Sequence, residues 1–320
     1  MKIKIEYIIL AVIILALSVY LLSRNTDKIN YALPVLSAIE VNDIKKVEIS
    51  GPKHTITLNK KDSKWYINEQ RYPADSVKVK NILDVIGKLD LTAMVSESKK
   101  YSRYNLADGE AINVRAWVEE KVGREFMIGK TASSYQHTFV RIAGDERVYH
   151  ASGSFRGKFE QTPDTLRDKV VLSFKPVEIQ GIDILKGDKS LTFSRTEIPV
   201  EMSNQEKPDS KAPSDKKAER LWKNAEGKEA DQSSLNSLLS MLSHLRCDSF
   251  PSDTKKNGLK NPVYRIKAKG LKTYELSIFP KIEKYGDKYP AVSSENEYPF
   301  LLTSLQAENI MKKVKGFETE

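Results

Sequence analysis

One short segment could bind a nucleotide phosphate, namely Gly129-Lys130-Thr131. A P-loop surrounds phosphate groups with backbone N–H groups and a lysine, and it needs the spacing G-x-x-x-x-G-K-[ST] at the start of a helix. Here the nearest upstream glycine, Gly123, lies one position too far away, and the segment falls between stretches that alternate like strands. We therefore predict no nucleotide site in this part of the chain.

Serine-based acyl transfer is suggested by the pattern Ser-x-x-Lys, in which a lysine can activate a serine hydroxyl. The companion motifs S-D-N and K-T-G are missing, and Gly153-Ser154 does not fit the order G-x-S-x-G of a nucleophile elbow. A chain rich in lysine and serine gives such pairs by chance. The pairs are Ser96 with Lys99, Ser214 with Lys217, and Ser252 with Lys255.

Cysteine and histidine chemistry is sparse. Cys247 is the single cysteine, so neither an intrachain disulfide nor a multi-cysteine metal site can form, and we expect a buried structural thiol. His137 and His150 fall on predicted strands that flank one hairpin, but a metal there would need a third or fourth ligand on the same face. We expect two surface histidines, and we name no catalytic, cofactor-binding or metal-binding residue and no cofactor.

The elements that would position any site are laid out twice in the chain. The stretch from Lys64 to Leu91 places a tryptophan before Ala-Asp and an amphipathic segment, and the stretch from Leu221 to Leu245 repeats this order. Apolar residues spaced by three and four lie on one face of a helix, and the aspartate before each face can cap that helix. The matched pairs, all 156 positions apart, are Ala74 and Ala230, Asp75 and Asp231, Val79 and Leu235, Ile82 and Leu238, Leu83 and Leu239, Ile86 and Leu242, and Leu89 and Leu245.

Alternating apolar and polar residues predict several short strands around each of these helices. We therefore expect an α+β fold in which an N-terminal transmembrane helix precedes two similar repeats, each an antiparallel β-sheet with a packed amphipathic helix. The predicted repeats cover residues 44–174 and 175–318, and a polar insertion at 197–219 has the composition of a disordered loop. Asn105 and Gly258 are expected to adopt the left-handed backbone conformation, which these two residue types tolerate best.

The amino-terminal residues have the composition of a membrane anchor at 1–24 followed by a linker at 25–43. The run from Tyr7 to Leu22 contains one serine and no charge, and it approaches the ~20 residues that a bilayer-spanning helix needs. A cleaved signal peptide ending near Ala16-Leu17-Ser18 is the alternative, although the apolar run continues past that site. Lysines before the run favour a cytoplasmic amino terminus and an exported body.

Length and charge bound the class of protein. The chain has 320 residues, enough for two domains of ordinary size. Its formal net charge is +9, but lysine and arginine are spread along the chain among 43 acidic residues, which is typical of a solvated surface. The sequence contains no zinc-finger spacing, RNA-binding aromatic motif or basic helix, so we predict no nucleic-acid partner.

A duplicated order of tryptophan-bearing strand, Ala-Asp, amphipathic helix and Asn-Leu or Gly-Leu turn, behind an apolar amino-terminal segment, resembles the bacterial domain-of-unknown-function family 4340. The likeness covers about residues 35–317. It implies an envelope protein associated with ABC-type transport systems, and it carries over no catalytic residue. The residues that carry it are Trp65, Ala74, Asp75, Leu89, Asn105-Leu106 and Ile128-Gly129-Lys130, with their counterparts in the second repeat.

Together these features predict a non-enzymatic, single-pass protein of the bacterial inner (cytoplasmic) membrane, held in the lipid bilayer by Tyr7 to Leu22, with its body on the exported side. Its expected role is that of a scaffold or accessory subunit of a membrane complex, with a membrane-protein partner that the sequence does not identify. One alternative is an envelope hydrolase with a site between the repeats. Another is a secreted ligand-binding protein, which requires cleavage near Ser18.

Overall fold

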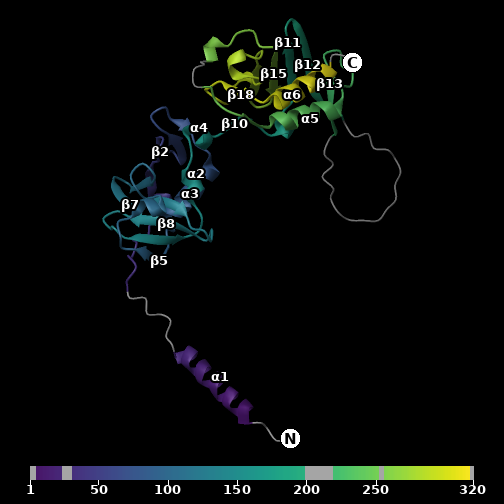
Figure 1. Cartoon of the computed structure of the whole chain (residues 1–320). Coiled ribbons are helices and arrows are strands. Elements are labelled where there is room, and N and C mark those ends of the chain that lie inside the picture. Colours follow the sequence, from purple (N-terminus) through teal and green to yellow (C-terminus); the bar gives the residue numbers. More distant parts are fainter. Residues whose placement is uncertain (1–4, 24–30, 199–218, 252–255, 318–320) are drawn as a thin grey trace. The chain divides into compact units, whose positions relative to one another are not determined.

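The computed structural model describes residues 5–23, 31–198, 219–251 and 256–317. The fold is α+β, with mostly antiparallel sheets and few helices, as the sequence predicts. The chain forms two compact units, the first from residues 1–63 and 78–161 and the second from residues 64–77 and 162–320 (Figure 1). The boundary expected at residue 174 follows sequence similarity, whereas this division follows contacts in space, so the two need not coincide.

The first sheet has nine strands in the order β4-β3-β2-β1-β6-β7-β8-β9-β5. Along β1, Val47 and Ile49 are buried, while Lys46 and Glu48 lie on the opposite, partly exposed face. This alternation is what a strand with one covered face requires. The strands are β1 (Ile44–Ser50), β2 (Thr55–Lys61), β3 (Lys64–Ile67), β4 (Tyr72–Pro73), β5 (Leu91–Ser96), β6 (Ile112–Val118), β7 (Lys121–Thr131), β8 (His137–Ile142) and β9 (Val148–Ser152).

The second sheet has seven strands in the order β13-β12-β11-β15-β16-β17-β18. A separate two-stranded sheet pairs β10 (Val170–Ser173) with β14 (His244–Arg246). When β4 and β5 are left out, the first sheet runs through its elements in the same order as the second. The strands of the second sheet are β11 (Gly181–Lys186), β12 (Lys189–Ile198), β13 (Glu219–Asn224), β15 (Tyr264–Lys269), β16 (Thr273–Ile278), β17 (Tyr289–Ser293) and β18 (Phe300–Leu302).

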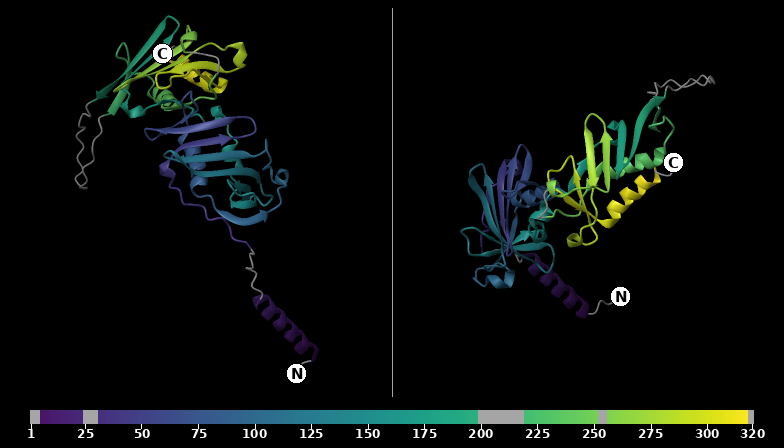
Figure 2. Two further views of the ribbon diagram at one scale, coloured as in Figure 1. Left: turned by 90° about the vertical axis from the view of Figure 1, so that its left-hand side faces the viewer. Right: turned by 90° about the horizontal axis from the view of Figure 1, so that it is seen from above.

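The predicted amphipathic helices are α2 (Ser76–Gly87) and α5 (Gln232–Leu242). They bury the expected residues, Val79, Ile82, Leu83 and Ile86 in α2 and Leu235, Leu238, Leu239 and Leu242 in α5. In the second unit, α5 and α6 (Ser304–Gly316) lie side by side over one face of the sheet, and both contribute to a core that also contains the fully buried Trp222 (Figure 2).

Both aspartates predicted to cap these helices accept backbone hydrogen bonds. The Asp231 side chain accepts from the N–H groups of Ser233 and Ser234, each at 3.0 Å. The Val77 N–H donates to Asp75 Oδ1 at 3.0 Å. Each carboxylate therefore satisfies donors that the first turn of a helix would otherwise leave unpaired.

Three expectations need correction, and the first two concern helix ends and turns. Leu89 and Leu245 are buried as predicted, but they lie beyond the ends of α2 and α5, and Leu245 belongs to β14. Asn105 has the predicted left-handed conformation, with φ 54° and ψ 40°. Gly258 is not among the glycines with positive φ, because it closes a 3-10 turn at Lys256–Gly258; Asn261 has positive φ (57°) instead.

The third correction concerns the insertion, and the expected membrane-spanning helix is not supported by the described residues. The predicted loop at 197–219 is shorter at both ends, because β12 and β13 pair as far as Ile198 with Glu219; residues 199–218 lie outside the described part of the chain. The predicted anchor contains α1 (Ile5–Ser23), whose large apolar side chains are exposed. Within the residues that the structure describes, no helix is long and apolar enough to cross a membrane.

Candidate functional site

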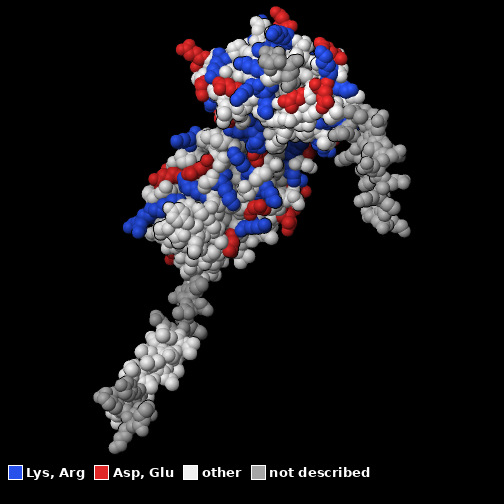
Figure 3. All heavy atoms as spheres, turned by 90° about the vertical axis from the view of Figure 1, so that its right-hand side faces the viewer, with Lys and Arg blue, Asp and Glu red and all other residues white. Residues whose placement is uncertain are grey.

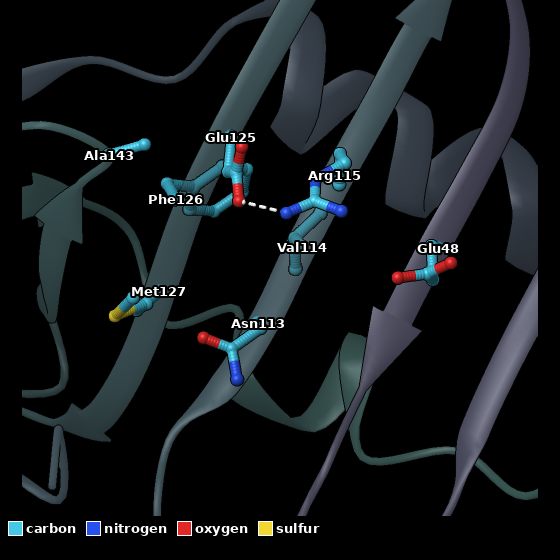
Figure 4. Close-up of a pocket in the computed structure, with 8 residues that line it drawn as sticks. All are labelled: Glu48, Asn113, Val114, Arg115, Glu125, Phe126, Met127 and Ala143. Atoms are coloured by element: carbon cyan, nitrogen blue, oxygen red, sulfur yellow. Dashed lines mark hydrogen bonds and ion pairs between the residues drawn. The ribbon is translucent and has the colours of Figure 1, made fainter. Parts of the chain in front are cut away.

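A small pocket opens on the polar face of the first sheet, within the first unit. It has a volume of about 40 Å³ and is lined by side chains from the neighbouring strands β1, β6 and β7 and by Ala143 (Figure 4). A site for a small organic ligand usually encloses roughly 300–1,000 Å³. This pocket can therefore hold little more than water. Its lining residues are Glu48, Asn113, Val114, Arg115, Glu125, Phe126, Met127 and Ala143.

The charges in this pocket form a row across three strands. Glu48 lies opposite Arg115, and Arg115 lies opposite Glu125 in the strand register. Figure 4 shows Arg115 directed at Glu125, and its Nη2 donates to Glu125 Oε1 at 2.6 Å. The hydrogen bond to Glu125, followed by the charges of Glu125 and Glu48, raises the pKa of Arg115. Arg115 therefore stays a cation, and one of the two carboxylates is already bound.

The second sheet carries an equivalent row of charges. Lys267 lies directly opposite Glu275, with Nζ 3.7 Å from Oε2, and Arg265 Nε lies 3.3 Å from Oε1 of the same glutamate. Opposite charges facing each other across strands stabilise a sheet. Because this pairing recurs, the Arg115–Glu125 pair is best interpreted as a contact that stabilises the sheet. The pocket lining contains no serine, cysteine or histidine that could act as a nucleophile.

A larger groove lies next to this pocket, shares Glu125 and Ala143 with it, and has a volume of about 350 Å³. Val35 and Val122 are both exposed on its rim, at 97% and 48%. At its floor, the buried Arg124 donates from Nη1 to the carbonyl of Ile86 at 2.6 Å, and from Nη2 to the carbonyl of Ser37. Ile86 belongs to the last turn of α2, where a cation also meets the negative end of the helix dipole.

The two strand histidines pack on each other and are partly buried, so the expectation of two surface histidines is wrong. The rings of His137 and His150 are stacked with centroids 5.1 Å apart, and Phe139 packs on His150 at 4.7 Å. Burial, and then the charge of His137, lowers the pKa of His150. In the described parts of the chain, no group of three or more histidine, cysteine or carboxylate side chains could hold a metal ion. The pair is therefore short of the ligands that a metal site needs.

Among the described residues, the remaining sequence motifs do not assemble into a site. Gly129-Lys130-Thr131 forms the end of β7 and does not open a helix, so the geometry of a P-loop is not present there. Cys247 is buried, and burial raises the pKa of its thiol to about 12, which suppresses the thiolate that a nucleophile requires. Ser214 and Ser252 lie outside the described residues.

Two buried arginines were missed by sequence reasoning, Arg124 and Arg167, each 7% exposed. No spacing signals them, because their partners come from segments far away in the chain. Arg124 contacts carbonyls near residues 37 and 86, and Arg167 packs among rings from Tyr72, Phe250 and Tyr298. Each stands directly before an acidic residue in the sequence, Glu125 and Asp168, as many surface arginines do, so nothing marks it as buried until the fold is known.

Comparison with known proteins places the chain in a family but gives it no activity. No curated protein and no solved structure matches it. The profile described as "Domain of unknown function (DUF4340)" matches residues 65–262, which is more than half of the chain and includes the tryptophan, Ala-Asp and Gly-Lys positions on which the resemblance was based. The chain belongs to the DUF4340 family.

Proposed function

We propose that the protein is a non-enzymatic scaffold or accessory subunit, anchored in the bacterial inner membrane and docked on a membrane-protein partner. The expected partner class is an ABC-type transport complex, which is what the family resemblance implies. The body is expected on the exported side. The tandem duplication is part of the proposal, and the shared strand order of the two sheets supports it.

The observation that carries this proposal is the surface of α1. Its described large side chains are aliphatic or aromatic and at least half exposed, for example Leu15 at 68% and Leu21 at 66%. Apolar residues occur all round the helix, so no single face could pack on a soluble core. In Figure 3 the visible described part of α1 is white, whereas the two units carry mixed basic and acidic side chains. Burial in lipid would remove this apolar surface from water.

The chemistry of the described pockets favours binding over catalysis. The 40 Å³ pocket contains a bound ion pair. The 350 Å³ groove is lined by apolar side chains together with Ser37, Glu125 and an arginine that is already bonded to carbonyls. Neither arrangement holds a nucleophile next to a base. A docking role needs only a stable, exposed surface.

Crosslinking in intact cells tests the partner. The full chain with an affinity tag is expected to recover a specific membrane protein after crosslinking and solubilisation in detergent. A variant with Val35→Glu and Val122→Glu, at the rim of the larger groove, separates docking through that groove from docking elsewhere. Recovery of no membrane protein by the wild type would contradict the scaffold role. Mass spectrometry of the mature amino terminus distinguishes an anchored chain from one cleaved near Ser18.

A further inference from the structure

Three arginines share a feature that is rare for this residue type, because burial lowers the pKa of each: Arg124, Arg167 and Arg195. Arg124 donates to the carbonyls of Ile86 and Ser37. Arg195, stacked on Trp222, donates to the Pro176 carbonyl and to Asn236 Oδ1, both at 3.1 Å. Arg167 has no hydrogen bond from its guanidinium to any described residue, and its Nε is buried without a partner.

Aromatic rings hold the Arg167 guanidinium. Its Cζ lies 3.5 Å from the centroid of Phe250, 3.8 Å from that of Tyr72 and 4.9 Å from that of Tyr298. Two aromatic rings therefore lie in direct contact with the guanidinium. Tyr298 packs edge-on against Tyr72 with centroids 5.0 Å apart. Because Nε is buried, the terminal nitrogens are the donors that remain for a ligand.

The neighbouring carboxylates are occupied by other cations. Asp164 pairs with Lys169 at 3.8 Å, and Asp164 Oδ1 also accepts the Phe250 N–H at 3.4 Å. Asp248 pairs with Lys288 at 2.7 Å, and Asp75 approaches Arg246 at 3.5 Å. The charge of Asp164 still acts on Arg167, but among the described contacts no Asp164 oxygen accepts a hydrogen bond from Arg167. Arg167 is thus the cation of this group that lacks a carboxylate of its own.

We propose that Arg167, packed against Tyr72 and Phe250, is an oxyanion-binding site of the second unit that takes a single carboxylate or phosphate group at its terminal nitrogens. A guanidinium presents parallel N–H donors that match two oxygens of such a group. The rings hold the Arg167 guanidinium in place before binding, so the side chain loses little conformational entropy when the anion binds. The anion supplies the acceptors that the protein leaves out.

Thermal unfolding of the full chain in detergent micelles tests the site, with sodium phosphate and sodium acetate as probes and sodium chloride at matched ionic strength as the reference. A ligand that binds only the native state stabilises it by RT ln(1 + [L]/Kd), so the unfolding midpoint keeps rising with the logarithm of ligand concentration once the concentration exceeds Kd. We expect such a rise with phosphate or acetate, and comparison of the two salts identifies whether phosphate or carboxylate is preferred. Chloride is expected to give none.

Two variants assign the effect to Arg167. Arg167→Lys keeps a charge but loses the planar fork, and it is expected to lower the apparent affinity for the anion at least tenfold. Arg195→Lys is the matched control, because Arg195 is also stacked on a ring but already bonded, and its response should equal that of the wild type. An Arg167→Lys protein that responds like the wild type would overturn the proposal.

A second measurement on the wild type keeps the test decisive if Arg167→Lys does not fold. The buried Nε–H of Arg167 is identified in nuclear magnetic resonance spectra by its proximity to the ring protons of Tyr72 and Phe250. We expect this resonance to shift saturably with phosphate or acetate while that of Arg195 does not. If neither a saturable shift of this resonance nor a rise in the unfolding midpoint is seen, Arg167 packs against the rings without binding an anion, and the proposal is wrong.

Discussion

Gly129 lies where another part of the backbone approaches β7 closely. A Cβ at this position would lie 2.2 Å from the Tyr104 carbonyl oxygen and 2.9 Å from Leu106 Cγ. The sequence motif Ile128-Gly129-Lys130 marks the position but suggests a phosphate loop as readily as a close approach. The structure assigns the glycine to packing of β7 against the turn at Asn105.

Gly129→Ala is expected to destabilise the protein by about 1–3 kcal/mol, the usual cost of forcing an extra group into a packed site. The clash here is with a backbone oxygen, which cannot rotate away. Gly258→Ala is the matched control, since a Cβ there meets nothing within 4 Å and the residue has no positive φ. Urea unfolding followed by circular dichroism measures both, and equal midpoints for the two variants would contradict the packing role.

Arg124→Met should also destabilise the first unit, because it leaves the carbonyls of Ile86 and Ser37 without a donor. An unpaired buried carbonyl costs about 1–3 kcal/mol. Arg115→Met removes an arginine of the same sheet that bonds only an exposed glutamate, so its effect on the urea midpoint should be far smaller. The account of Arg124 fails if the two substitutions have the same effect.

Cys247 is predicted to be inert in the folded protein. Burial raises the pKa of its thiol to about 12, so the thiolate is scarce at pH 8. An unfolded cysteine ionises near pH 8.5, so this residue contributes stability that is complete below that value and is lost as pH rises towards 12. A thiol reagent at pH 8 should react within minutes in urea and only after unfolding in buffer. Rapid reaction of the folded protein would contradict this.

At the scale of elements, sequence periodicity predicts the helices better than the strands that follow them. The faces of α2 and α5 and both aspartate caps can be recognised, because residues three and four apart share one side of a helix. Short strands such as β10 and β14 give no clear signal in the sequence. β14 has three residues and β10 has four, too few to show an alternation, and their pairing with each other joins segments about 70 residues apart.

The cap of α5 gives a prediction on pH. Hydrogen bonds from Ser234 lower the pKa of Asp231, so the folded state binds its proton less readily than the unfolded chain does. Its contribution to stability is therefore present above the unfolded value of about 4 and is lost as pH falls through the lowered value. Asp231→Asn keeps the cap without the titration, since asparagine caps equally well.

The urea midpoint of Asp231→Asn should accordingly fall less than that of the wild type between pH 7 and pH 3. Asp231→Ala, which removes the cap, should be less stable than the wild type at pH 7. If Asp231→Asn shows the same loss on acidification as the wild type, the carboxylate is not the titrating group.

At the scale of the whole molecule, the sequence predicts the fold class and the family, but not the buried arginines. The Arg167 cluster draws on Tyr72, Phe250 and Tyr298 from three separate segments of the second unit, and only the packed fold brings them together. Conversely, the motifs that sequence reasoning considered for chemistry are dispersed among strands and turns.

The proposal that α1 holds the protein in a bilayer is tested most directly by extraction of membranes with alkaline carbonate. A lysine near the middle of a membrane span costs about 2.5–3.5 kcal/mol, whereas a lysine at its end can extend to the interface. The wild type and Leu22→Lys are expected to stay in the membrane pellet, and the double variant Ile14→Lys with Leu15→Lys is expected to be released. Release of the wild type into the supernatant, or equal retention of the double variant, would contradict the account.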